Sequence, residues 1–272
     1  MRHSVHTKDT DVEHNTKQER IMKKTALAAL MVAMTPMAAQ ADLLFTVGAK
    51  ASVWNAEPTG QLDDGVSVES ETNGLGLESN DGSQITLFFE HPVPTIPNLR
   101  LRQTSFETTG SGFLAADFNG VIYAEQVESE FDLSHTDATL YWGVPLPVPY
   151  VDVNFGLTAR MFDGYAIVEG QTSGREEVEL DFTVPMGFLE AQVGSPFGLY
   201  AQAEINVIGY DGNSMRDTVV TLGYDLPVPV VDLGLELGHR SVSMKTNADT
   251  TDIETDVELS GLFYGASFAV GF

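Results

Sequence analysis

His135 and Asp137, in the segment SHTD, are the residues whose types and spacing could do chemistry. They stand two positions apart, so in an extended strand both side chains point to the same face. A histidine oriented by a carboxylate can act as a general base when a third group is present for it to activate. The segment supplies two of the three parts, which makes His135 and Asp137 the catalytic candidates.

Charged residues at alternating positions form a second group with chemical potential. In residues 151–161, for example, Asp152 and Arg160 alternate with apolar neighbours, which places all the charges on one face of a strand. Charges that share a narrow interior are costly unless they pair, so the pattern predicts ion pairs across a lumen. This network is either a structural plug or a region that selects a small solute. The predicted lumen set is Lys50, Glu90, Arg100, Arg102, Asp152, Arg160, Glu190, Glu204, Asp225, Glu236 and Arg240.

The elements that position these residues are alternating apolar and polar segments. Short proline-rich connections, such as VPLPVPYVDV at 144–153, follow every second segment, and longer acidic connections follow the others. Proline has no N–H for a ladder and therefore closes strands in tight turns. Ten strands are expected, near 43–55, 84–91, 98–107, 130–144, 150–162, 177–193, 199–210, 217–226, 231–244 and 257–272.

An even number of strands, with short turns on one side and long loops on the other, is typical of an outer-membrane barrel. The sequence therefore predicts an all-β fold: a closed antiparallel transmembrane β-barrel of about ten strands, with short periplasmic turns and long acidic extracellular loops. A soluble periplasmic β-sandwich remains the alternative fold, since alternation alone fits both. The apolar phase changes within 177–193 near Pro185 and Gly187, which predicts a β-bulge there.

Composition narrows the partners and cofactors. The chain carries 14 Lys and Arg against 39 Asp and Glu, a net charge of −25, so nucleic acid is not an expected partner. It contains no cysteine, which excludes disulfides, thiolate metal sites and a cysteine nucleophile. Neither ESNDGS nor YDGNS has calcium-loop spacing, and Asx-Gly turns explain both segments. No cofactor or resident metal site is expected, beyond weak binding of Ca²⁺ or Mg²⁺ by the acidic loops.

The N-terminal region predicts export. Residues 22–41 combine two lysines, an apolar stretch and the small-residue site Ala39-Gln40-Ala41, which is the layout of a secretory signal peptide. Residues 1–21 are polar and are interpreted as a spurious N-terminal extension, with Met22 as the true start; a long signal n-region is the alternative. The mature barrel is then residues 42–272, located in the outer membrane of a Gram-negative bacterium.

The C-terminal segment LFYGASFAVGF has an apolar residue at every second position. Such a strand with a final Phe resembles the signal that the barrel-assembly machinery reads, here through Tyr264, Phe268, Val270 and Phe272. The expected partners are this machinery during biogenesis, and outer-membrane lipid and lipopolysaccharide afterwards. The protein is expected to be a monomer.

The stretches AQADLLFTVGA and LFFEHPVPTIPNLRL, with the final Phe, resemble an uncharacterised proteobacterial outer-membrane β-barrel family found in genomes with GlyGly-CTERM sorting systems. The distinctive motif is EHPVP-x-x-PN, and the likeness extends over most of residues 42–272. The resemblance implies a barrel and an outer-membrane location, but no activity. A non-enzymatic barrel with a filled polar lumen and a surface or structural role is the leading functional hypothesis. A narrow channel for small solutes and a hydrolase at the rim are the alternatives.

Overall fold

The structure is a computed structural model that describes residues 45–62, 65–118, 120–246 and 255–272. The predicted signal peptide and N-terminal extension lie outside the described residues. Within the described ranges the regular elements are all β-strands. No helix there is long and apolar enough to cross a membrane.

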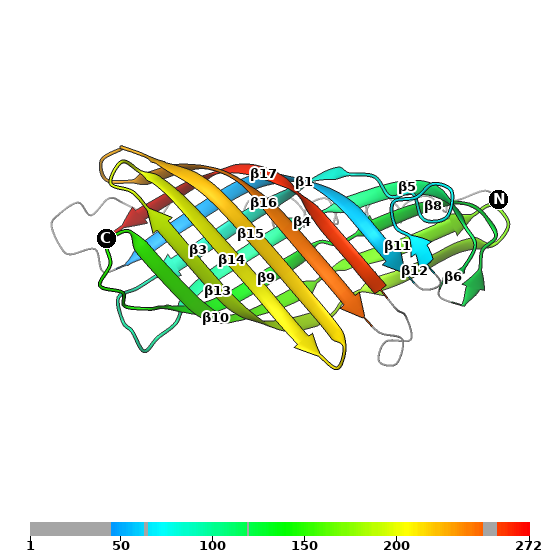
Figure 1. The fold of residues 1–272 in the computed structure, drawn as a ribbon, viewed down its shortest axis with the longest axis horizontal. Helices are drawn as coiled ribbons and strands as arrows, with labels where there is room; N and C mark the ends of the chain where they lie inside the picture. Colours follow the sequence, from blue (N-terminus) through cyan, green and yellow to red (C-terminus); the bar gives the residue numbers. More distant parts are fainter. Residues whose placement is uncertain (1–44, 63–64, 119, 247–254) are drawn as a thin grey trace, which may run out of the picture. The chain divides into compact units, whose positions relative to one another are not determined.

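Ten antiparallel strands form a closed ring, which confirms the predicted fold class (Figure 1). The last strand pairs with the first, with Val270 opposite Val47, so the ring has no free edge. The ring order follows the chain: β1 (Thr46–Leu62), β3 (Asn80–Glu90), β4 (Asn98–Ser105), β9 (His135–Gly143), β10 (Val151–Phe162), β13 (Thr183–Gly194), β14 (Leu199–Tyr210), β15 (Asn213–Leu226), β16 (Asp232–Thr246) and β17 (Thr255–Gly271).

The two faces of the ring have opposite character. Apolar side chains on the outer face are widely exposed, as expected for a surface that meets lipid rather than water. The inner face instead buries full charges, including Arg160 and Arg240. The outward residues include Ile85, Leu157, Leu189, Leu222, Leu237 and Leu262.

The connections sort by end as the sequence predicted. Residues 91–97, 144–150, 195–198 and 227–231 join strands at one end, here called the short-turn end. The opposite long-loop end carries the longer connections, except between β14 and β15. There Asp211 and Gly212 form a two-residue hairpin turn with φ values of 52° and 82°. Asp-Gly is a preferred sequence for such a turn because both residues need positive φ.

The longer connections contain a second, four-stranded sheet beyond the barrel, here called the outer sheet (Figure 1). Its order, β12-β11-β8-β5, repeats the order of the barrel strands β13-β10-β9-β4 that continue into it. One wall of the barrel therefore extends past the rim. The outer sheet consists of β5 (Glu107–Leu114), β8 (Glu125–Asp132), β11 (Gly164–Gly170) and β12 (Gly174–Leu180); the short strands β2 (Val66–Ser67), β6 (Asp117–Phe118) and β7 (Val121–Ile122) lie in the same connections.

The outer sheet corrects two predicted boundaries. The predicted strands 130–144 and 177–193 each divide between the outer sheet and the barrel. The predicted bulge near Pro185 and Gly187 is wrong, because β13 pairs with β10 without interruption from Thr183 to Val193. The apolar phase changes because the chain passes from one sheet to the other at 181–182.

Candidate functional site

A buried ion-pair network closes the middle of the lumen. Arg160 binds Asp137 through two hydrogen bonds of 2.8 Å and also pairs with Asp217. Asp217 in turn accepts hydrogen bonds of 3.0 and 2.6 Å from Arg240. Arg160, Asp217 and Arg240 each have 0% exposure. These side chains come from β9, β10, β15 and β16, so the network joins walls that are far apart in the ring.

Arg240 completes the closure of the lumen. Its guanidinium donates to Thr104 on β4 at 3.1 Å and lies 3.3 Å from His135 Nε2 on β9. β16 and β9 stand five places apart in the ring of ten, which makes this contact a diametrical one. The guanidinium also stacks on Trp54, 4.8 Å from the ring centre.

A second layer of ion pairs lies next to the first, toward the short-turn end. Arg100 donates to Glu190 at 2.8 Å and to Glu204 at 2.9 Å. Arg102 binds both oxygens of Glu204 at 2.8 Å. These contacts link β4 to β13 and β14 across the lumen. Planar guanidinium forks that meet carboxylates in this way are strong and directional.

Two smaller groups fill the lumen near the short-turn end. Glu236 accepts 2.7 Å hydrogen bonds from Lys50 and from the Tyr200 hydroxyl. The ring of Tyr200 lies against Gly223, where an added Cβ would be 2.1 Å from a ring atom, so a larger residue would displace it. On the other side, Tyr141 donates to Glu90 at 2.7 Å.

The space that remains between these layers is small. A polar cavity of about 40 Å³ lies among Lys50, Gln84, Arg102 and Glu204. A water molecule needs roughly 10–15 Å³ of such volume, so the cavity has room for about three waters. Among the described residues, ion-paired and hydrogen-bonded side chains thus surround a cavity too small for a solute larger than a few waters.

His135 and Asp137 lie on the same face of β9, but each contacts different partners. Nδ1 of His135 lies 2.8 Å from the Leu133 carbonyl, and Nε2 faces the Arg240 guanidinium. Because arginine only donates, Nε2 accepts and Nδ1 carries the proton. Both oxygens of Asp137 bind Arg160. Among the described contacts, no hydrogen bond joins His135 to Asp137.

Other predicted residues lie outside the network. Asp152 and Asp225 are exposed near the short-turn end. His91 stabilises its proline-rich turn, since it contacts the Pro97 carbonyl and the Val93 amide. His239 is exposed on the outer face. The four residues of the predicted insertion signal are exposed or half-buried: Tyr264, Phe268, Val270 and Phe272.

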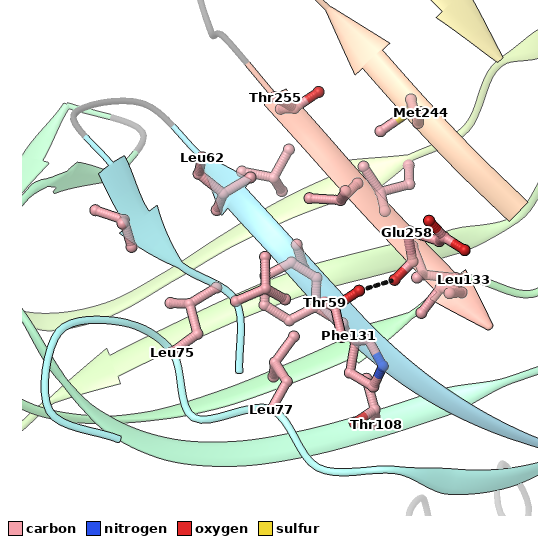
Figure 2. Close-up of a pocket in the computed structure, with 18 of the residues that line it drawn as sticks. Thr59, Leu62, Leu75, Leu77, Thr108, Phe131, Leu133, Met244, Thr255 and Glu258 are labelled. Atoms are coloured by element: carbon pink, nitrogen blue, oxygen red, sulfur yellow. Dashed lines mark hydrogen bonds between the residues drawn. The ribbon is translucent and has the colours of Figure 1, made fainter. Parts of the chain in front are cut away.

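The half of the lumen toward the long-loop end is apolar and hollow. A cavity of about 870 Å³, here called the chamber, extends from Trp54 and His135 to the outer sheet. Figure 2 shows side chains of β1 and β17 and of the segment after β2 converging on it. Its wall includes Leu62, Leu75, Leu77, Phe131, Leu133 and Met244.

The outer sheet separates the chamber from the acidic surface. Thr108, Phe131 and Ala166 on one face line the chamber. The opposite face carries Glu128 directly across from Glu169, and Glu107 across from Asp132. Like charges opposite each other destabilise a sheet, so the apolar face and the ladder hold this sheet together. Among the described residues, no group of three metal-ligating side chains is arranged to hold an ion.

Two titratable groups of the outer sheet, beyond the membrane-spanning strands, have shifted pKa values. The amides of Ser173 and Thr172 donate to the Glu125 carboxylate and lower its pKa. The hydrogen bond of Tyr165 to Glu130 raises the pKa of the Tyr165 phenol to about 12. Glu125 thus ties β8 to the turn before β12, and Tyr165 ties β11 to β8, so both groups hold the outer sheet together.

Sequence reasoning missed the centre of the network and the chamber. Asp217 begins the predicted strand 217–226 and lies an even number of positions from Asp225, which was predicted to face the lumen. That spacing is the signal that could have placed Asp217 inside. On β16, Val242 and Met244 have the same parity as Arg240. That parity indicates that the lumen becomes apolar toward the long-loop end.

Comparisons with known proteins return only distant likenesses. No protein-family model matches the chain, and no curated protein matches it. The solved β-domain of the Bordetella autotransporter BrkA aligns at 9% identity and TM-score 0.39, covering 84% of this chain and 100% of that one. The attachment invasion locus protein Ail of Yersinia pestis aligns at 10% identity and TM-score 0.38, covering 83% of this chain and 99% of that one. The Pseudomonas putida toluene transporter TodX aligns at 8% identity and TM-score 0.36, covering 85% of this chain and 90% of that one.

Likenesses this weak say nothing about what the chain binds. The class of the protein follows instead from its own architecture: a closed even-stranded ring, an apolar outer face and buried charges on the inner face. These define an integral β-barrel of the outer-membrane type.

Proposed function

We propose that this protein is a non-conducting, non-enzymatic barrel of the Gram-negative outer membrane that acts at the cell surface. The observation that carries the proposal is the closed network of Arg160, Asp217 and Arg240, none of which has any exposed surface. A channel needs charges that line a water path, whereas these charges bind one another across the lumen. Short turns face the periplasm, and the outer sheet faces the medium.

The non-enzymatic assignment is supported by the contacts of the catalytic candidates. A general base needs a free lone pair within reach of a substrate proton. The acceptor nitrogen of His135 is occupied by Arg240, and Asp137 is held by Arg160. The protein is a monomer in contact with outer-membrane lipid and lipopolysaccharide, and it is inserted by the barrel-assembly machinery through its last strand.

Surface labelling of intact cells tests the orientation. Lys245 lies on β16 at the long-loop end with 56% of its side chain exposed, whereas Lys50 lies inside the barrel. An amine reagent that cannot cross the outer membrane should therefore label Lys245 in whole cells. Lys245→Arg should abolish that labelled peptide. Labelling of Lys245 only after the cells are broken would overturn the assigned orientation.

Liposome swelling tests the closed lumen. Proteoliposomes that contain the full-length protein purified from membranes should swell in arabinose no faster than protein-free liposomes. Liposomes with an open porin provide the matched positive control. Swelling that rises with the amount of this protein would contradict a closed barrel and restore the channel hypothesis.

A further inference from the structure

The chamber is too large to be a packing defect. Protein interiors are close-packed, and voids larger than a water molecule are few. The chamber encloses about 870 Å³, within the range of roughly 300–1,000 Å³ that is typical of small-molecule sites. The polar cavity of the same lumen measures about 40 Å³, so the barrel itself does not impose such a void.

The wall of the chamber selects ligands by polarity. Most lining side chains are aliphatic or aromatic, contributed by the barrel and by the outer sheet. Two lining hydroxyls are engaged: Thr108 donates to the Glu78 carbonyl, and Thr59 contacts the Glu258 carbonyl (Figure 2). The buried Trp54 Nε1 has no hydrogen-bond partner among the described residues. A predominantly apolar lining with few polar groups is typical of sites for apolar small molecules.

The charge of the wall excludes anions. The described lining contains no Lys or Arg, while Asp117 contributes a carboxylate. Arg240, which contacts the lining residues Trp54 and His135, is already bound to Asp217. An anionic ligand such as a fatty-acid carboxylate has no counter-charge here and would lose its hydration.

We propose that the chamber is a binding site for one uncharged, largely apolar small molecule, of hydrocarbon character. The ligand enters the outer half of the lumen, and the ion-pair network stops it from passing to the short-turn end. The site goes beyond the proposed function, because a barrel can be closed and surface-located without binding any ligand.

The two tryptophans provide matched reporters for this site. Trp54 lines the chamber with 1% exposure, and Trp142 stacks on Phe155 near the short-turn end. Trp142→Phe leaves Trp54 as the only tryptophan, and Trp54→Phe leaves Trp142. The probe is 1-bromododecane, an uncharged alkane whose bromine quenches tryptophan at short range, with full-length protein in detergent micelles.

Binding predicts saturable quenching of Trp54 that unbrominated dodecane reverses and dodecanoate does not. Trp142 should be quenched only in proportion to the bromoalkane in the micelle. Quenching of Trp54 that is unsaturable and matches Trp142 would overturn the proposal, and so would reversal by dodecanoate as effective as by dodecane. The Trp54 readout leaves the chamber wall intact, because Trp142→Phe lies outside the chamber, whereas the Trp142 readout replaces the lining ring of Trp54 by a smaller one.

A substitution locates the site. Ala166→Phe, made with Trp142→Phe, places a ring in the chamber from the outer sheet and should raise the apparent Kd for the probe about tenfold by removing contact area. Thr109→Phe adds the same ring to the exposed face of that sheet and should leave the Kd unchanged. Equal Kd values for both variants, with retained barrel mobility on unheated gels, would place binding elsewhere and overturn the assignment. Conductance and swelling assays test separately whether the barrel is closed.

Discussion

The two halves of the lumen differ in how they fill the same ring of strands. Toward the short-turn end, inward arginines and carboxylates meet across the barrel and border a cavity of about 40 Å³. Toward the long-loop end, inward apolar residues leave about 870 Å³. Long charged side chains reach the opposite wall, whereas leucine and valine do not. The alternation of side chains along each strand therefore sets which residues face inward. The length of those side chains and their pairing determine whether the interior closes.

The largest expected effect comes from the filled half. Asp217→Ala leaves the guanidiniums of Arg160 and Arg240 buried without their shared carboxylate, which we expect to lower the free energy of unfolding by about 3–5 kcal/mol. Denaturant unfolding of the folded barrel in detergent measures this loss. Arg175→Ala removes an ion pair that is half exposed and should cost less than about 1 kcal/mol. Similar losses for the two variants would mean that the network is not a tightly coupled unit.

A smaller effect is expected in the hollow half. Leu77 borders the chamber, so Leu77→Ala enlarges an existing void and should cost about 2 kcal/mol, at the low end for a buried leucine. The same unfolding measurement checks the value, and hydrogen exchange should show the loosening in the outer sheet. A loss as large as that of Asp217→Ala would indicate that the chamber is tightly packed in solution.

The ion pair nearest the short-turn end should contribute less again. The Lys50 side chain is 30% exposed, and Glu236 keeps its hydrogen bond from Tyr200 when the lysine is removed. Lys50→Ala is therefore expected to cost about 1 kcal/mol in the unfolding assay. A loss above that of Leu77→Ala would show that the network extends to the mouth of the barrel with full strength.

The smallest effect is local and depends on pH. The folded-state pKa of Glu125 is lowered by the amides of Ser173 and Thr172, so the carboxylate stabilises the turn between β11 and β12. A lowered pKa means that this contribution is complete above the unfolded-state pKa and is lost as the pH falls through the folded-state pKa. Pepsin cleavage at residues 171–173 should therefore rise at acidic pH. Pepsin should cleave the Glu125→Gln variant at a rate that changes little with pH beyond the intrinsic pH response of pepsin.

The sequence predicted the ring well because each of its signals is local. Prolines such as Pro145 and Pro227 mark the short turns, and alternating faces mark the ten strands. Parity also placed Arg100, Arg160 and Arg240 on the inner face. Only the tertiary register shows which carboxylate each arginine meets, because Arg160 and Asp217 are separated by 57 positions in the chain.

The outer sheet and the chamber were harder to predict. Acidic strands such as β8, with Glu128 and Glu130, have the composition of a solvated loop. Their ladder exists because four neighbouring barrel strands align them. The bulge prediction failed for the same reason, since a phase change within one apolar segment fits either an inserted residue or a passage between sheets. Cavity volume depends on packing from several strands and has no signature in any one of them.

Single-channel recording tests the central claim, a lumen closed by its own ion pairs, most directly. Full-length protein purified from membranes, whose unheated gel band shows a folded barrel, is added to a planar lipid bilayer beside an open porin as control. We predict a silent bilayer at potentials where the porin gives discrete steps. Discrete steps from this protein, changed in size by Arg100→Ser or Arg160→Ser, would contradict the closed lumen and locate the constriction of a channel.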